Sequence, residues 1–196
     1  MDGPASRDLV KRAQAGSAPA LEALYERSAG RLLAYIRLRM GAELRTRLES
    51  RDILQATLLK SLEHLPEFEG AHSGSLIAWL AAIAEHEIRD RVDYQQRGRR
   101  DAAREVRLET DPSLPALARS ALTQAIVTEE AERLEAALET LSPAHREIIL
   151  LRKYQELPFA EIGRRLGKTD DACRMLLARA MTALTIALVG NPQSSG

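Results

Sequence analysis

Apolar residues recur every three or four positions through the first half of the chain, a spacing typical of α-helices with one buried face. Four helices are expected there: a short one after Ser6, one from Ala18 to about Gly41, one from about Glu49 to just before Pro66, and a long one from near Ser75 that turns polar and basic through Arg97. Segment 67–75 holds two glycines and two serines and predicts a loop. No segment alternates convincingly with a period of two, so we expect no strands.

The second half begins with another helical stripe. Leucines at helical spacing, the last of them Leu141, predict a helix that starts near Thr128. Ser142 and Pro143 suit the cap and first turn of the next helix, which is expected to reach about Tyr154.

Between these two helical blocks, residues 106 to about 126 contain Pro112 and Pro115 but no clear apolar period, and they predict a linker. The chain is therefore expected to be an all-α protein with two small helical domains joined by a flexible linker. The expected bounds are 1–105 for the first domain, 106–127 for the linker, 128–189 for the second domain and 190–196 for a disordered tail.

The stretch from residue 158 to 180 predicts a helix-turn-helix. A short helix from about Pro158 contains Gly163, at a position where two crossing helices need a very small residue. Gly167 permits the tight turn, and Thr169 can cap the helix that follows. A helical hairpin with no role in DNA binding is the alternative interpretation.

The second helix of such a unit enters the major groove of DNA, with its first two turns facing base edges. The residues expected near bases are Lys168, Thr169, Asp170, Asp171 and Arg174, and those better placed for phosphates are Arg164, Arg165 and Arg179. For the two aspartates, a favourable place at the positive end of the helix is a sufficient explanation without any contact to DNA.

Composition agrees with helices packed through leucine and alanine, because 45% of the residues are hydrophobic but only 4% are aromatic. The single cysteine, Cys173, excludes an internal disulfide framework and is expected to be a small core residue. No run of 18 apolar residues occurs, and the first residues do not resemble a secretory signal. The expectation is a soluble cytoplasmic protein without membrane insertion.

The formal net charge of zero conceals a change of sign along the chain. Residues 89–107 carry seven arginines and four acidic residues. Residues 108–142 carry two arginines and seven acidic residues, and residues 144–179 carry eight basic and five acidic residues. Two basic blocks separated by an acidic connector favour two surfaces that face a polyanion. Arginine-rich helix faces that are merely solvated remain the alternative.

Features of an enzyme are absent from the sequence. The four histidines are scattered, and no pair has the spacing of metal ligands with an acidic or cysteine partner. There is no glycine-rich phosphate loop and no nucleophile with a matching base. We therefore expect no catalytic activity, no cofactor and no metal.

Three stretches resemble one family. LETLSPAHREIILLRKYQELPFAEIGRRLG (138–167) resembles region 4 of bacterial RNA polymerase sigma factors, whose pattern is L..LP...R.v..L....g.s..EIa..lg. LESRDILQATLL (48–59) is similar to region 2.2, and LIAWLAAIAEHEIRDR (76–91) is similar to regions 2.3 and 2.4. Both regions in this order, with only a short linker between them, resemble the extracytoplasmic-function (ECF) type, group 4 of the primary-sigma superfamily.

The resemblance implies a factor that directs core RNA polymerase to promoters, with region 2 melting the −10 element and region 4 reading the −35 element. It implies that the partners are core RNA polymerase, through the β′ clamp helices and the β subunit, promoter DNA, and an anti-sigma factor or another regulator. It also implies that the helix-turn-helix residues given above face the −35 element.

The resemblance assigns residues of the first domain as well. Those expected to bind core polymerase are Glu49, Asp52, Gln55 and Glu63. Those expected at the −10 element are Phe68, His72, Ser73 and Ser75 around a pocket for a flipped base, and His86, Arg89 and Arg97 along the strand. Trp79 is expected to anchor the core of its helix rather than to stack on a base.

Two departures concern the first domain. Ala56 stands where an acidic residue usually follows the region 2.2 glutamine, which predicts weaker core binding or a larger share for Asp52 and Glu63. Phosphorylation of Thr57 is a hypothesis for restoring that charge. His86 stands where asparagine is common, so the −10 preference is expected to differ from the family's.

In the second domain, Gly163 replaces the usual alanine, and this replacement is expected to loosen its helix slightly.

A DNA-binding regulator, or a sigma-like decoy that does not bind core polymerase productively, is the alternative function, and Ala56 is its main support.

Overall fold

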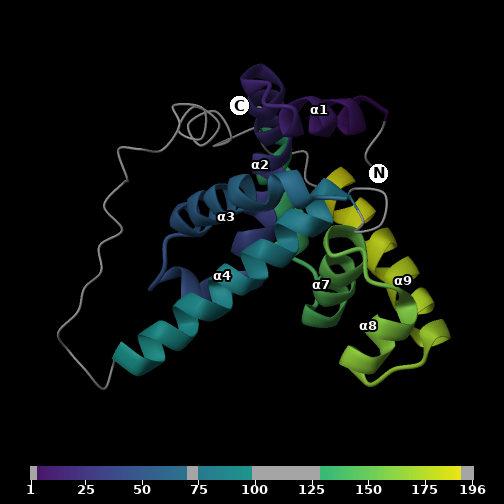
Figure 1. The fold of residues 1–196 in the computed structure, drawn as a ribbon. Helices are drawn as coiled ribbons and strands as arrows, with labels where there is room; N and C mark the ends of the chain where they lie inside the picture. Colours follow the sequence, from purple (N-terminus) through teal and green to yellow (C-terminus); the bar gives the residue numbers. More distant parts are fainter. Residues whose placement is uncertain (1–3, 70–74, 99–128, 191–196) are drawn as a thin grey trace, which may run out of the picture. The chain divides into compact units, whose positions relative to one another are not determined.

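The described residues of the computed structural model are 4–69, 75–98 and 129–190, and no strand occurs among them (Figure 1). The chain divides into two compact units, Met1–Ile126 and Val127–Gly196. An all-α protein with two helical domains is therefore confirmed. The predicted linker and residues 191–196 of the predicted tail lie outside the described residues.

The first unit contains the four predicted helices. They are α1 Pro4–Gln14, α2 Ala18–Arg45, α3 Ser50–His64 and α4 Leu76–Gly98, with a 3₁₀ turn, η1 Leu65–Glu67, after α3. Helix α1 packs on α2, while α2, α3 and α4 pack on one another. The apolar stripes meet in a core whose fully buried side chains include Leu32, Ile36, Ile53, Leu58 and Leu80.

Helix α2 breaks at the position where the sequence predicts its end. Gly41 has φ 67° and ψ 173°, a conformation that favours glycine, and the chain then resumes a helical turn as far as Arg45. The predicted helix therefore ends at its glycine as expected, but one further turn follows the kink.

A partly buried ion pair joins α2 to α4. Arg39 donates through Nε and Nη2 to both carboxylate oxygens of Glu85, at 2.8–3.0 Å, and the hydroxyl of Tyr35 donates to the same carboxylate at 2.9 Å. Burial by itself would raise the pKa of Glu85, but the hydrogen bonds from Arg39 and Tyr35 outweigh it and hold the pKa below its ordinary value.

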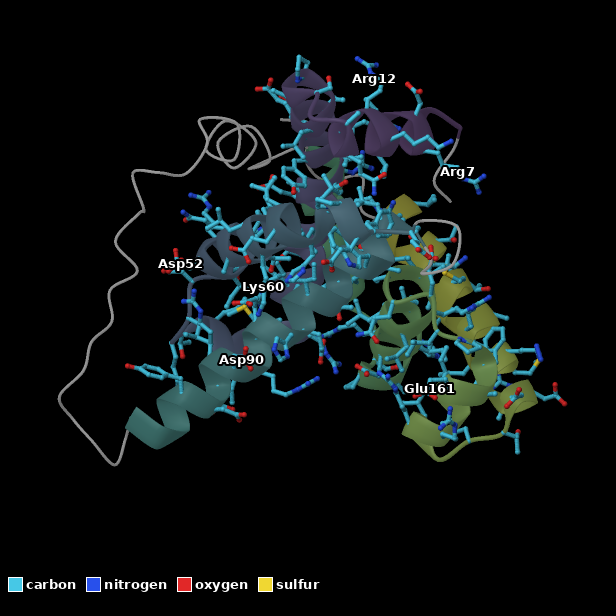
Figure 2. The ribbon with its side chains drawn as sticks, viewed as in Figure 1. Arg7, Arg12, Asp52, Lys60, Asp90 and Glu161 are labelled. Atoms are coloured by element: carbon cyan, nitrogen blue, oxygen red, sulfur yellow. The ribbon has the colours of Figure 1, made fainter. Side chains whose placement is uncertain are left out.

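Two further polar contacts tie α3 to its neighbours. Tyr25 of α2 shares a hydrogen bond of 2.8 Å with Ser61, and burial raises the pKa of Tyr25 to about 12. Lys60, labelled in Figure 2, donates to Glu87 of α4 at 2.8 Å. These contacts fix the orientation of α3 and therefore of the residues on its outer face.

The second unit contains α6 Glu129–Glu139, α7 Pro143–Ile149, η2 Leu150–Tyr154, α8 Phe159–Leu166 and α9 Asp170–Val189. Helices α6, α7 and α8 each pack against α9, through residues that include Leu138, Ile148, Ile162, Cys173 and Ala180. Cys173 is fully buried in this core, as the sequence predicts.

Caps define the entry to α7. The Ser142 hydroxyl accepts from the backbone N–H of His145 at 3.3 Å, and Pro143 occupies the first turn, as predicted. Arg146 reaches back to the end of α6 and donates to the carbonyls of Leu138, Glu139 and Leu141. The predicted helix to Tyr154 ends differently, because its last five residues form the wider π-helical turn η2.

Helix α9 is, by length and composition alone, apolar enough to cross a membrane. It carries four charged residues, however, and its buried side chains (Cys173, Ala180 and Leu184) pack inside the second unit. A single helix of this kind is weak evidence for a membrane span, so the composition of α9 does not by itself indicate insertion.

Candidate nucleic-acid and polymerase interfaces

The turn between α8 and α9 is tight. Gly167 has φ 63° and ψ 38°, the left-handed conformation that closes a helix, and Lys168 donates its backbone N–H to the Gly163 carbonyl at 2.9 Å. Thr169 caps α9, because its hydroxyl accepts from the N–H of Ala172 at 3.2 Å. The predicted helix-turn-helix is confirmed.

Gly163 is more constrained than the sequence indicates. A Cβ atom at this position would lie 2.5 Å from the Lys168 carbonyl oxygen, which is part of the backbone of the turn. The expectation that alanine and glycine differ here only by a mild loosening of the helix is wrong, because alanine cannot be accommodated unless the turn shifts.

The residues predicted to face bases lie at the start of α9. Lys168, Thr169, Asp171 and Arg174 are exposed, while Asp170 is half-buried, with a carboxylate oxygen close to Gly163 of α8. Arg174 approaches the Asp171 carboxylate at 3.6 Å, with side-chain exposures of 54% and 96%. The first two turns of α9 thus present a mixed cationic and anionic surface that has room for a partner.

The predicted phosphate-binding arginines of α8 share one carboxylate. Arg165 donates to Glu161 at 3.1 Å, and Arg164 also pairs with it (Glu161 is labelled in Figure 2). The hydrogen bond from Arg165 is the main reason that the pKa of Glu161 lies below its ordinary value, and Arg164 contributes in the same direction. Arg179 is exposed farther along α9.

Sequence reasoning missed Phe159, the first residue of α8. Two guanidinium groups approach its ring: the Cζ of Arg174 lies 4.8 Å from the ring centre, and the Cζ of Arg152 lies 4.9 Å from it. Both distances fall within the range of cation–π contacts. The sequence gives no signal for this cluster, because its members are up to 22 positions apart.

Glu156 was also missed, although the sequence does contain a signal for it. Its φ of 54° is in the left-handed region, and it occupies the position where the region 4 pattern has glycine. Arg152 holds this turn by donating to the carbonyls of Glu156 and Leu157, at 3.4 and 2.8 Å.

Phe68, predicted to line the −10 pocket, is buried in the first unit. Only 6% of the residue is exposed, and its ring centre is 4.9 Å from that of Trp79. Trp79 is half-buried beside this ring, and its expected place as the core anchor of its helix stays a prediction. Because the Phe68 ring is already packed against Trp79, it cannot offer a free face to a base.

The remaining residues predicted at the −10 element are only partly described. Ser75 accepts from the Ala78 N–H at 3.4 Å at the start of α4. His86 and Arg89 are exposed on α4, and His86 lies 3.3 Å from Asp90. His72 and Ser73, and the side chain of Arg97, lie outside the described residues.

Gln14 of α1 is a residue that no local pattern could reveal. Its side-chain amide donates to the carbonyls of Leu65 and Phe68, at 2.9 Å each, across more than 50 positions of sequence. It fixes the backbone from which the loop after Phe68 departs.

The predicted polymerase-binding residues gather on α3. Asp52 and Glu63 are exposed, Gln55 is half-buried, and Glu49 is exposed at the N-cap of the helix. Successive residues of an α-helix are rotated by about 100° around its axis, and on that basis the four residues fall within about 60° of one line along the helix. Figure 2 shows Asp52 on α3. Ala56 belongs to the same acidic stripe, whose charges are those of Glu49, Asp52 and Glu63, so the stripe carries no charge at position 56.

The hypothesis that Thr57 is phosphorylated is wrong for the folded protein. Thr57 is fully buried, and its hydroxyl donates to the Ile53 carbonyl at 2.7 Å inside the first unit. A kinase could reach this hydroxyl only if α3 left the core.

Within the described ranges, no group of three or more His, Cys, Asp or Glu side chains could hold a metal ion.

Comparisons with known proteins agree on one family. The Sigma-70 region 2 family model matches residues 24–98, and the Sigma-70, region 4 model matches residues 131–184. The chain is 29% identical over 192 residues to the ECF RNA polymerase sigma factor BldN of Streptomyces coelicolor, with 93% of this chain and 66% of BldN covered. It is also 29% identical over 182 residues to the RNA polymerase sigma factor CarQ of Myxococcus xanthus, with 89% and 92% covered.

Among solved structures, CnrH in complex with the cytosolic domain of CnrY is similar, with a TM-score of 0.47 and 21% identity. The match covers 95% of this chain and 99% of that chain.

Proposed function

This chain belongs to the ECF sigma factors and recognises promoters, and from that premise we propose how its two units divide the work. The first unit binds core RNA polymerase through α3 and melts the −10 element beside α4. The second unit reads the −35 element with α9. Sigma factors are initiation factors, so the proposal includes no catalytic step.

One observation carries the proposal: the acidic stripe on α3 and the exposed start of α9 belong to separate compact units of one chain. The stripe of Glu49, Asp52 and Glu63 suits a basic partner surface such as that of the β′ clamp helices. Arg174 on α9 suits a guanine edge, since a bidentate contact of this kind discriminates between bases by roughly 1–3 kcal/mol.

Strand separation at the −10 element needs only a better partner for an unpaired base than its complement. Unstacking costs a few kcal/mol per base, which stacking and edge hydrogen bonds in a pocket can recover. We propose that His72, Ser73 and Ser75 contribute to that pocket. His86, Arg89 and Arg97 then follow the strand along α4.

The further partners in the proposal are the β subunit of the polymerase and an anti-sigma factor or another regulator that withholds the protein from the polymerase. We propose that the protein works in solution in the cytoplasm, where polymerase and promoter are both present.

Gel filtration with purified core polymerase tests the first half of the proposal. The full chain is expected to co-elute with core enzyme, and Asp52→Ala is expected to reduce co-elution. Glu26→Ala, which removes an exposed carboxylate of α2, is the matched control and should co-elute like the wild type.

The second candidate function is a sigma-like regulator or decoy that does not use core polymerase productively. The half-buried Ala56 in the middle of the acidic stripe favours it, since the stripe lacks a charge there. Failure of the wild-type chain to co-elute with core polymerase, together with retained binding to promoter DNA, would establish this candidate and reject the first.

A further inference from the structure

The side chain of Arg174 is held in place by a ring from the preceding helix. Its Cζ atom lies 4.8 Å from the centre of the Phe159 ring, and 54% of the side chain remains exposed. A guanidinium over an aromatic face is attracted by the electrons of the ring. The charged end of Arg174 is therefore localised while still accessible to a partner.

The ring itself is anchored. Phe159 is the first residue of α8, and that helix is fixed to the core of the second unit by the fully buried Ile162. On the other side of the connection, Arg152 lies 4.9 Å from the ring centre and donates to the carbonyls of Glu156 and Leu157. The platform under Arg174 thus belongs to the rigid frame of the helix-turn-helix.

The other contact of Arg174 restrains it less. Asp171 approaches at 3.6 Å, but its side chain is 96% exposed. Ion pairs between exposed groups are screened by water and contribute little. The ring, which is fixed in α8, is therefore the better anchored of the two restraints on the direction of this guanidinium.

We infer that Phe159 is a positioning residue, which orients the guanidinium of Arg174 toward base edges and so sets base choice in the upstream promoter element. This inference rests on the proposed function, in which α9 reads that element. The N–H donors of a guanidinium form a planar fork that matches two acceptors on a guanine edge. A fork oriented before binding loses less conformational freedom when it docks.

A purely structural role for the ring would give a different result. If Phe159 only filled space at the start of α8, then its loss would lower the stability of the second unit and weaken binding to all sequences alike. A positioning role instead changes the preference among sequences and acts only when Arg174 is present.

The experiment measures promoter choice by the full chain bound to core polymerase. Competing DNA fragments carry single substitutions in the upstream element, and discrimination is the ratio of their affinities. Phe159→Leu and Phe159→Met, which keep an apolar side chain without a ring, are expected to lower discrimination at one base pair by between about twofold and tenfold. Phe159→Tyr, which keeps the ring face, is the matched control and should retain the wild-type ratio.

Two further measurements separate positioning from folding. In an Arg174→Ala background, Phe159→Leu is expected to leave discrimination unchanged, because there is no guanidinium left to orient. In the free chain, without DNA or polymerase, the Arg174 Nε–H resonance is expected to show a ring-current shift that disappears in Phe159→Leu and Phe159→Met. That shift reports the contact without any DNA.

The outcomes distinguish this inference from the function on which it rests. If Arg174→Ala discriminates as the wild type does, then α9 does not read bases through this residue, and both the proposed reading and the inference fail. If Arg174→Ala loses discrimination while folded Phe159→Leu and Phe159→Met keep it, then only the inference is overturned. A loss of discrimination caused by Phe159→Leu in the Arg174→Ala background overturns it as well.

Discussion

At the scale of single residues, Glu156 adopts a left-handed backbone conformation that glycine would adopt more easily. A left-handed φ of 54° is unfavourable for any residue with a Cβ atom, by roughly 1–2 kcal/mol. The turn persists because Arg152 and the helices on both sides of it determine its shape.

Glu156→Gly is expected to be more stable than Glu156→Ala by about 1 kcal/mol, measured by thermal or denaturant unfolding. Both variants lack the glutamate side chain, so the comparison isolates the backbone. At the exposed, helical Lys153 the order should reverse, with alanine more stable than glycine. Equal stability of the two variants at position 156 would contradict the strain.

Glu85 gives a pH dependence. Because its pKa is lowered in the folded protein, the carboxylate stabilises the fold above its ordinary pKa, and this contribution is lost as the pH falls through the folded value. Glu85→Gln is expected to lower the free energy of unfolding by about 1–2 kcal/mol near pH 7, allowing for partial exposure of the pair. The gap between variant and wild type should shrink below about pH 4.

Glu43→Gln is the control for Glu85, because Glu43 forms an exposed i,i+4 pair with Arg47. It should change stability by less than about 0.5 kcal/mol at any pH. A gap at Glu85 that stays constant from pH 7 to pH 3 would show that the carboxylate charge is not what stabilises the contact.

At the scale of elements, the turn of the helix-turn-helix depends on the absence of a side chain at Gly163. Alanine normally stabilises a helix interior by about 1 kcal/mol relative to glycine. Here its Cβ would meet a backbone oxygen at 2.5 Å, so we expect Gly163→Ala to destabilise the second unit and to weaken promoter binding. Ala160→Gly, at an exposed position of the same helix, should show only the ordinary cost of about 1 kcal/mol. A stabilised Gly163→Ala variant would contradict the constraint.

Helix α3 offers a gain-of-function test. Ala56→Glu places a carboxylate in the gap of the acidic stripe, and we expect core polymerase to bind about 1.5- to 5-fold more tightly, the range of one exposed ion pair. Ala82→Glu, which adds the same charge at an exposed position of α4, is the control. Equal effects of the two substitutions would mean that net charge, not the stripe, governs the affinity.

The helices themselves could be predicted because each buries one apolar stripe. Spacing also located the break at Gly41 and the caps at Ser142 and Thr169, where the chemistry is local. What sequence reasoning missed is either long-range or depends on which face a residue occupies. Gln14 acts on carbonyls more than 50 positions away, and no local pattern encodes such a contact.

Thr57 was misassigned although the signal was present, because it lies one turn from the buried Ile53 and beside the buried Leu58. Phe68 was treated as part of a polar loop, yet a large aromatic residue next to an apolar helix favours burial against it. Both cases show that a position within a motif does not establish exposure.

At the scale of the whole molecule, two units with different surfaces belong to one chain. The first presents an acidic stripe and an exposed polar face of α4, while the second presents the start of α9. Each surface by itself would bind weakly. In the proposed function, holding both surfaces on one polymerase would make the second contact effectively intramolecular, so that affinity for a promoter would exceed that of either unit.

The most direct test is run-off transcription by purified core polymerase on a panel of promoter fragments, with wild type, Asp52→Ala and Arg174→Ala compared. The wild-type chain is expected to start transcription at a subset of promoters. Asp52→Ala should reduce output at all of them, and Arg174→Ala should change which are used. If the wild type gives no promoter-dependent transcript, or if both variants transcribe as the wild type does, then the proposed division of work between the two units is contradicted.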